Sequence, residues 1–178
     1  MYEGERVRLR AFDNSDLMPC LRFRNDYAVM RTAQGGILYP ATVDDVGSAM
    51  GENSSRASGA YQFAIETKED RRFIGQCGFL SVNWKNRVGE AAILIGEEAY
   101  RGKGYGADAM KTLCRFAFEE MNLRKIKASV FDFNTPALRG YQKCGFQQEG
   151  LLRREIYREG AYHDVMLLCL FREGGEEH

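Results

Sequence analysis

The sequence predicts an α/β (α+β) fold, with one domain whose mixed, mostly antiparallel sheet has about seven strands and is covered by about four helices. The chain has 178 residues, the length of one domain, and its 44% hydrophobic and 28% charged residues are typical of globular proteins. Short stretches alternate between apolar and polar residues, which is the period of strands, and after Gly96 the period becomes helical. We expect the domain to span residues 1–172 and to end in a polar, frayed tail over 173–178.

The composition excludes several classes of protein. Lys plus Arg and Asp plus Glu both number 25, so the net charge of zero argues against a protein that coats nucleic acid or an anionic membrane. The five cysteines include no C-x-x-C and the two histidines have no zinc-binding spacing, which indicates a reducing compartment and no metal. No window approaches the ~20 apolar residues of a membrane helix, and the N-terminus is too charged for a signal peptide. We expect a cytoplasmic protein without nucleic-acid, membrane or metal partners, and a homodimer remains open.

The first part of the chain predicts a strand and two helices. Apolar residues alternate with arginines from Val7 to Ala11, as in a half-buried strand. Asp13–Asp16 supplies N-cap chemistry for a helix in which Pro19 occupies the first turn, where a missing N–H is tolerated. Thr42–Asp45 has the pattern of a capping box, which opens a second helix followed by a loop over Gly51–Gly59.

An antiparallel meander and a long helix follow. Tyr61 begins a strand of alternating apolar residues, and short polar turns separate it from strands over Phe73–Val82 and Val88–Ile95. From about Gly104 to Met121 the apolar residues recur at helical spacing and form one stripe.

The last part predicts a strand, a short helix and a hairpin. Lys125–Val130 alternates as a strand. Asn134 precedes a helix over Pro136–Cys144, because proline is favoured in the first helical turn. Gly150–Tyr157 and Tyr162–Leu170 are separated by a polar turn and form a terminal hairpin.

The segment Arg101–Gly106, with the sequence RGKGYG, opens the long helix after an apolar strand. Its glycines leave backbone N–H groups open to phosphate oxygens, and its two cations add charge. A P-loop fails because five residues separate Gly96 from Gly102 where the motif has four, and Gly104 replaces the Ser or Thr that binds Mg²⁺. A Rossmann fingerprint matches from Gly102 to Ala107, but the antiparallel hairpins around it disfavour that fold. A turn that binds nothing is the structural alternative.

The same segment has the pattern R-x-x-G-x-G, and two further motifs follow it: Asn134-Thr135-Pro136-Ala137 and Tyr141-x-Lys143-x-Gly145-Phe146. With these motifs the chain resembles the GNAT superfamily of N-acetyltransferases, in particular the branch of ribosomal-protein-alanine and spermidine acetyltransferases. The resemblance covers nearly the whole chain and extends to Val7–Arg10, Val29–Arg31, Phe73–Gly75, Glu149–Arg153 and Gly160–Asp164. It implies a GNAT fold with a splay between the fourth and fifth strands.

The resemblance implies acetyl-CoA as co-substrate, held where Ala91–Ile95 diverges from Lys125–Val130. A bulge there would free backbone groups for the pantetheine arm, and the pyrophosphate would lie on the N–H groups that open the long helix. Asn134 would bond the cofactor near the thioester, although helix capping explains an asparagine there equally well. The implied cofactor-binding residues are Leu94, Ile95, Gly96, Arg101, Gly102, Lys103, Gly104, Tyr105, Gly106, Asn134 and Lys143.

The resemblance also implies that Tyr141 is the general acid, because a phenol with a pKa of about 10 is protonated at pH 7 and can protonate the departing thiolate. The alternative for this side chain is a packing aromatic. Glu90 would accept the proton of the amine directly or through water, and His163-Asp164 is the other candidate base. Cys144 could form an acyl-enzyme, but nothing places a base beside it, so core packing is preferred.

The expected function is direct transfer of acetyl from acetyl-CoA to a primary amine. A polyamine, a protein N-terminus, an amino acid and an amino sugar are all open as acceptors, because Arg24–Gly59 and Arg153–Asp164, which would select the acceptor in this superfamily, contain both acids and arginines. The alternative from another class is a CoA-binding sensor or interaction module with little turnover.

Overall fold

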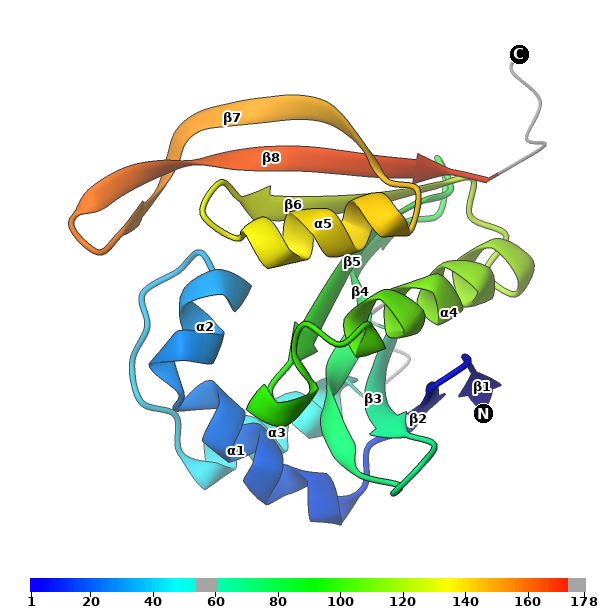
Figure 1. The fold of residues 1–178 in the computed structure, drawn as a ribbon, viewed down its shortest axis with the longest axis vertical. Coiled ribbons are helices and arrows are strands. Elements are labelled where there is room, and N and C mark those ends of the chain that lie inside the picture. The colour runs from blue at the N-terminus through cyan, green and yellow to red at the C-terminus, as the bar shows by residue number, and fades with distance from the viewer. Residues whose placement is uncertain (54–60, 173–178) are drawn as a thin grey trace.

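The computed structural model describes residues 1–53 and 61–172 (Figure 1). An eight-stranded sheet has the order β1-β2-β3-β4-β5-β6-β8-β7 in the described residues. Its strands are β1 (Tyr2–Glu3), β2 (Val7–Arg10), β3 (Tyr61–Thr67), β4 (Phe73–Asn83), β5 (Val88–Ile95), β6 (Lys125–Phe131), β7 (Gln147–Arg158) and β8 (Ala161–Phe171). The α-helices are α1 (Leu17–Arg24), α2 (Tyr27–Ala33), α3 (Val43–Asn53), α4 (Tyr105–Glu119) and α5 (Thr135–Lys143).

The predicted mixed, mostly antiparallel sheet is confirmed, because only β5 and β6 are parallel neighbours in the described sheet. The structure adds two elements to the prediction. The strand β1 has two residues, too few to show an alternating pattern. The helix α2 begins where the Asp26 carboxylate accepts a hydrogen bond from the Ala28 N–H group at 2.9 Å, directly after α1 ends at Arg24. In the described part of the chain, no helix is long and apolar enough to cross a membrane.

The predicted helix starts are confirmed by their caps. The Asp13 carboxylate accepts the Ser15 N–H group at 2.6 Å, and the Asp16 carboxylate accepts the Asp13 N–H group at 2.9 Å, which completes a capping box before α1. Thr42 and Asp45 exchange the corresponding bonds at the start of α3. The helix α3 continues to Asn53, two residues into the predicted loop, and residues 54–59 of that loop lie outside the described residues, as does the tail over 173–178.

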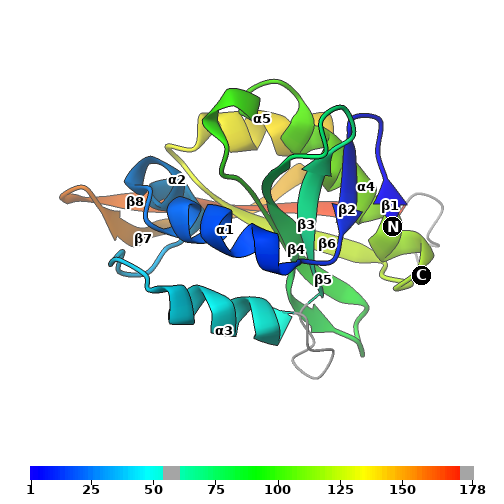
Figure 2. The same ribbon diagram turned by 90° about the horizontal axis from the view of Figure 1, so that it is seen from below.

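Two hydrophobic clusters lie on opposite faces of the sheet. Neighbouring strand residues point to opposite faces, and accordingly Ile65 belongs to the cluster under α4 and α5 whereas Ala64 belongs to the cluster under α1, α2 and α3. Figure 2 shows α5 on one side of the sheet and α3 on the other. The predicted stripe of the long helix is buried in the first cluster: Met110, Leu113, Cys114, Phe116, Ala117 and Met121.

Asp108, in the first turn of α4, fastens the N-terminal segment to that helix. Its carboxylate accepts the backbone N–H groups of Glu5, Arg6 and Val7 at 3.0, 2.8 and 2.9 Å. Three donors from one segment converge on one charged acceptor, so the start of β2 is held against the N-terminus of α4.

Replacing Asp108 with alanine is therefore expected to lower the free energy of unfolding by about 1–3 kcal/mol, because the three N–H groups lose a charged acceptor. Urea unfolding followed by circular dichroism measures the change. The control is Glu119→Ala, which removes an exposed carboxylate from the same helix. Equal losses in the two variants would contradict a specific role for Asp108.

Candidate active site

The strands β5 and β6 diverge, as the resemblance implies. They pair only from Val88 to Glu90, opposite Lys125 to Lys127. Beyond Glu90, β5 pairs with β4 and β6 pairs with β8, so one backbone edge of β5 faces the gap between them. A strand edge without a neighbour presents unpaired N–H and C=O groups to a ligand.

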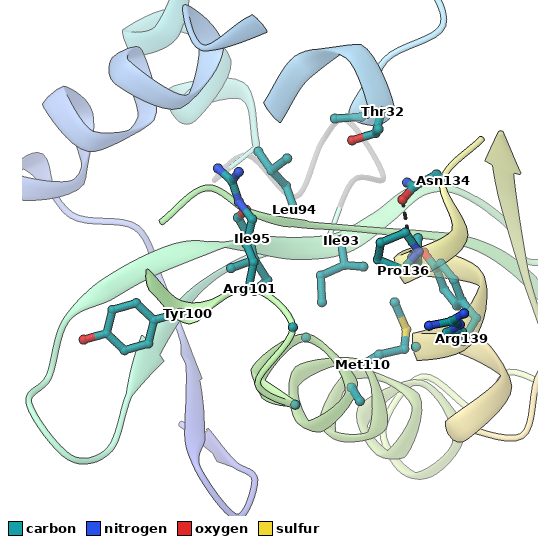
Figure 3. Close-up of a pocket in the computed structure, with 18 of the residues that line it drawn as sticks. Thr32, Ile93, Leu94, Ile95, Tyr100, Arg101, Met110, Asn134, Pro136 and Arg139 are labelled. Atoms are coloured by element: carbon teal, nitrogen blue, oxygen red, sulfur yellow. Dashed lines mark hydrogen bonds between the residues drawn. The ribbon is translucent and has the colours of Figure 1, made fainter. Parts of the chain in front are cut away.

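The bulge expected at Leu94–Gly96 lies elsewhere. The β4–β5 register shifts between Phe79 and Ser81 on β4, whereas Leu94 and Ile95 keep regular partners. A Cβ atom on Gly75 would collide with the carbonyl oxygen of Leu94, so the backbone of Leu94 points to β4. Backbone groups of successive strand residues point to opposite edges, and therefore Ile93 and Ile95 face the gap. The open edge therefore presents the backbone groups of Ile93, and Leu94 lines the cavity (Figure 3).

Both backbone groups of Gly96 have partners within the protein. Its N–H group donates to the Ile74 carbonyl at 2.9 Å, and its own carbonyl accepts from the Arg101 guanidinium at 2.6 Å. A Cβ atom at this position would collide with the Phe23 ring, so glycine is required here for the close approach of α1.

Arg101 holds the turn before α4 to the end of β5. Its guanidinium donates to the carbonyls of Ile95 at 3.0 Å and Gly96 at 2.6 Å, and its backbone N–H group donates to Glu98 at 3.1 Å. That N–H group therefore has a partner within the protein. The side chain still lines the cavity and supplies a positive charge.

A cavity of about 560 Å³ lies between the open edge of β5, the N-terminus of α4, α5 and α2 (Figure 3). Its size is that of a small-molecule site. Among the described residues that line it there are three cationic side chains, those of Arg101, Arg139 and Lys143, and there is no aspartate or glutamate. The cavity is thus suited to an elongated ligand with an apolar part and anionic groups.

The turn that opens α4 has the conformation that a phosphate site needs. Gly102 and Gly104 have φ angles of +69° and +88°, which side chains rarely adopt, and a Cβ atom on Gly102 would have no atom within 4 Å. The first N–H groups of a helix have no intrahelical acceptor and bind anions. The Tyr105 ring is buried, the Lys103 side chain is exposed, and neither lines the cavity.

Asn134 has the capping role that the sequence left open and also lines the cavity. Its side-chain oxygen accepts the Ala137 N–H group at 3.3 Å, drawn as a dashed line in Figure 3, and caps α5. The residue also lines the cavity, and no described residue is hydrogen-bonded to its side-chain NH₂ group. Capping holds the side chain in place while the amide donor remains for a ligand.

Tyr141 is buried in the first cluster, packs its ring against Phe146 at 5.1 Å and lines the cavity. Burial raises the pKa of its hydroxyl above the usual value, so the phenol stays protonated at neutral and mildly alkaline pH. No described residue is hydrogen-bonded to this hydroxyl. Burial likewise raises the pKa of Cys144, whose thiol donates to the Ala107 carbonyl at 3.4 Å, which disfavours a nucleophilic thiolate.

The candidate bases lie outside the cavity lining. Glu90 is half-buried and shares a strand face with Leu94, on the side of α1–α3, whereas Tyr141 belongs to the opposite cluster. The expected pair His163-Asp164 is corrected, because the Nδ1 atom of His163 lies 3.1 Å from a carboxylate oxygen of Asp132. The Asp164 carboxylate instead accepts the Arg154 N–H group at 2.8 Å.

Sequence reasoning missed three parts of the site. Arg139 lies one turn before Lys143 on α5, and their i, i+4 spacing was the available signal. The backbone of Ile93 and the α2 residues that line the cavity have no local signal, because strand register and helix docking place them. Those α2 residues are Ala28, Val29, Thr32 and Ala33.

The family described as "Acetyltransferase (GNAT) domain" matches residues 6–147. This chain belongs to the GNAT family. It is an N-acetyltransferase of this family, which uses acetyl-CoA. The glycine turn and the divergence of β5 from β6 lie within the matched residues.

Similar GNAT proteins cover nearly the whole chain. The SPbeta prophage-derived uncharacterized N-acetyltransferase YokL of Bacillus subtilis (strain 168) is 27% identical over 172 residues, which are 97% of this chain and 93% of that protein. The spermidine N(1)-acetyltransferase of Escherichia coli (strain K12) is 28% identical over 180 residues, with 97% and 89% covered. The crystal structure of spermidine N-acetyltransferase from Vibrio cholerae in complex with CoA and spermine has a TM-score of 0.83 and 25% identity, and covers 93% of this chain and 95% of that one.

Proposed function

We propose that this GNAT enzyme transfers acetyl directly to a primary amine, with Tyr141 as general acid and Glu90 as the acceptor of the amine proton. One observation carries the proposal: a cavity lined by cations and by no described carboxylate connects the glycine turn of α4 with the buried, protonated Tyr141. When bound, acetyl-CoA supplies a thioester that is activated for attack by a neutral amine.

The residues present fit this co-substrate at three places. The N–H groups that open α4 and the positive φ angles of Gly102 and Gly104 suit a pyrophosphate. The open backbone edge at Ile93 and the N–H group of Ile95 suit the amide groups of a pantetheine arm. Arg139 and Lys143 supply charge for a further phosphate.

Two groups of the chain act on the reacting centre. The N–H group of Ile93 or Ile95 is placed to stabilise negative charge on the thioester oxygen, because a fixed donor in a partly dry site needs no reorganisation. The Oη atom of Tyr141 holds the proton that the departing sulfur requires. Since burial raises the pKa of Tyr141, this proton is retained across the working pH range.

The acceptor amine is proposed to approach from the face of α1–α3, where Glu90 points. This places the proton acceptor and the general acid on opposite faces of the sheet, with the gap between β5 and β6 connecting them. The amine can then lose its proton on one side while the sulfur gains one on the other.

Glu90→Gln is expected to lower kcat/KM at pH 7 by on the order of 10²-fold, the lower end of general base effects, with little change in CoA affinity. The loss should shrink as the pH approaches about 10, where an aliphatic amine deprotonates without help. A pH profile of thiol release measures this, with the exposed Glu69→Gln as control. A loss that is independent of pH would assign Glu90 a structural role.

The proposed function is tested by CoA-thiol release from acetyl-CoA with separate acceptors: spermidine, spermine, peptides with free N-termini, amino acids and amino sugars. Polyamines come first because related GNAT proteins are spermidine acetyltransferases. At least one primary amine should raise thiol release above the rate without acceptor. Tight CoA binding without release by any amine would instead indicate a CoA-binding module.

A further inference from the structure

The Arg6 side chain lies against the glycine turn, Arg101–Gly106, that opens α4, although Arg6 is 97 residues away from Lys103 in the sequence. Its Nη1 atom donates to the Lys103 carbonyl, and its guanidinium lies over the Tyr105 ring, 4.0 Å from the ring centre. A Cβ atom on Gly104 would lie 3.6 Å from the same Nη1 atom. The side chain therefore contacts Lys103 and Tyr105 and lies beside Gly104, in the segment that opens α4.

The main chain holds Arg6 in this place from two sides. Its N–H group donates to the Asp108 carboxylate at 2.8 Å, and the next residue, Val7, is fully buried in β2. These contacts do not involve the Arg6 side chain. The guanidinium can thus be removed by substitution while the backbone anchor remains.

The charge of Arg6 is uncompensated, unlike that of its neighbours. Arg8 lies 3.1 Å from a Glu3 carboxylate oxygen, and Arg10 lies 2.7 Å from Asp16 and 2.6 Å from Glu66. Of the described carboxylates, none lies within 4.0 Å of the Arg6 guanidinium. A cation without a carboxylate partner, beside a helix N-terminus, favours an anionic ligand at that point.

We propose that Arg6 is a positioning residue of the pyrophosphate site: it fixes the Gly102–Gly104 turn through the Lys103 carbonyl and adds a positive charge beside it. The inference rests on the proposed function, since it assumes that CoA phosphates bind at this turn. Arginine suits the position because its planar group donates to a carbonyl, stacks on an aromatic ring and keeps further donors free. The N-terminal strand thereby becomes part of the cofactor site.

The test compares ligands with and without phosphates. In Arg6→Gln, the Kd of CoA and the KM of acetyl-CoA should rise about tenfold, the value of one hydrogen bond to a charged group, while kcat stays close to wild type. The Kd of pantetheine and the KM of S-acetylpantetheine, which lack phosphates, should not change. Arg6→Lys should show a smaller loss, because it keeps the charge and loses the planar fork. Calorimetry supplies the Kd values without turnover.

The matched control is Arg8→Gln, on the same strand, which should leave all four constants unchanged. Wild-type affinity for CoA in both Arg6 variants would overturn the inference, and so would an equal loss for pantetheine, which would indicate general damage to the fold. If the wild-type protein itself binds no CoA, the proposed function fails together with the inference. If it binds CoA and the Arg6 variants bind equally well, only the inference fails.

Discussion

Gly104→Glu is expected to abolish acetyl-CoA binding, with a loss of affinity on the order of 10²-fold or more, because a carboxylate takes the place where a phosphate meets the start of α4. Gly104 has a φ angle of +88°, so any side chain there also strains the turn that presents the N–H groups. The protein offers no steric obstacle, since the nearest atom to a Cβ at this position is Nη1 of Arg6 at 3.6 Å. The domain should therefore fold, and calorimetry with CoA measures the lost affinity.

Gly160→Glu is the matched control for this substitution. Gly160 lies in the β7–β8 turn with a φ angle of +81°, and a Cβ there would have no atom within 4 Å. It carries the same backbone strain and the same added charge but lies outside the cavity lining. CoA affinity should remain at the wild-type value in this control. Unchanged affinity in Gly104→Glu would refute the phosphate site at α4.

Tyr141→Phe is expected to lower kcat by on the order of 10²–10⁴, the range of general acid–base catalysis. The KM for acetyl-CoA should barely change, because the ring that packs against Phe146 remains and only the hydroxyl is lost. Burial raises the pKa of Tyr141, so in the wild-type enzyme this group should cause no loss of activity below about pH 10, where a free phenol already ionises by half. Single-turnover measurements over about pH 6–10 isolate the chemical step.

Tyr162→Phe is the control, because it removes a hydroxyl from an exposed tyrosine on β8. Its kcat should equal that of the wild-type enzyme. Wild-type turnover in Tyr141→Phe would show that solvent or another group protonates the sulfur. A raised KM with unchanged kcat would indicate instead that the hydroxyl contacts the ground state.

The sequence by itself determined the elements whose causes are local. The capping residues Asp13 and Asp16, Thr42 and Asn134 mark helix starts because their side chains bond N–H groups two or three residues away. Alternating and helical periods reveal which face of a strand or helix is buried, and the stripe on α4 is buried as predicted. The glycine turn is likewise a short, continuous signal, and together with the Asn134 and Tyr141 motifs it carries the resemblance to the GNAT family.

Only the tertiary structure decided which groups of these elements reach the site. The register between β5 and β4 decides whether the backbone groups of Ile93 or those of Leu94 face the gap. A shift of this register by one residue would turn each backbone N–H and C=O group of β5 to the opposite edge. The pairing of His163 with Asp132 and the contact of Arg6 with Lys103 join residues far apart in the sequence. No local pattern encodes such contacts, because they arise from the packing of whole strands and helices against one another. The sequence therefore identifies candidate side chains for the chemistry, and the fold determines which groups they contact.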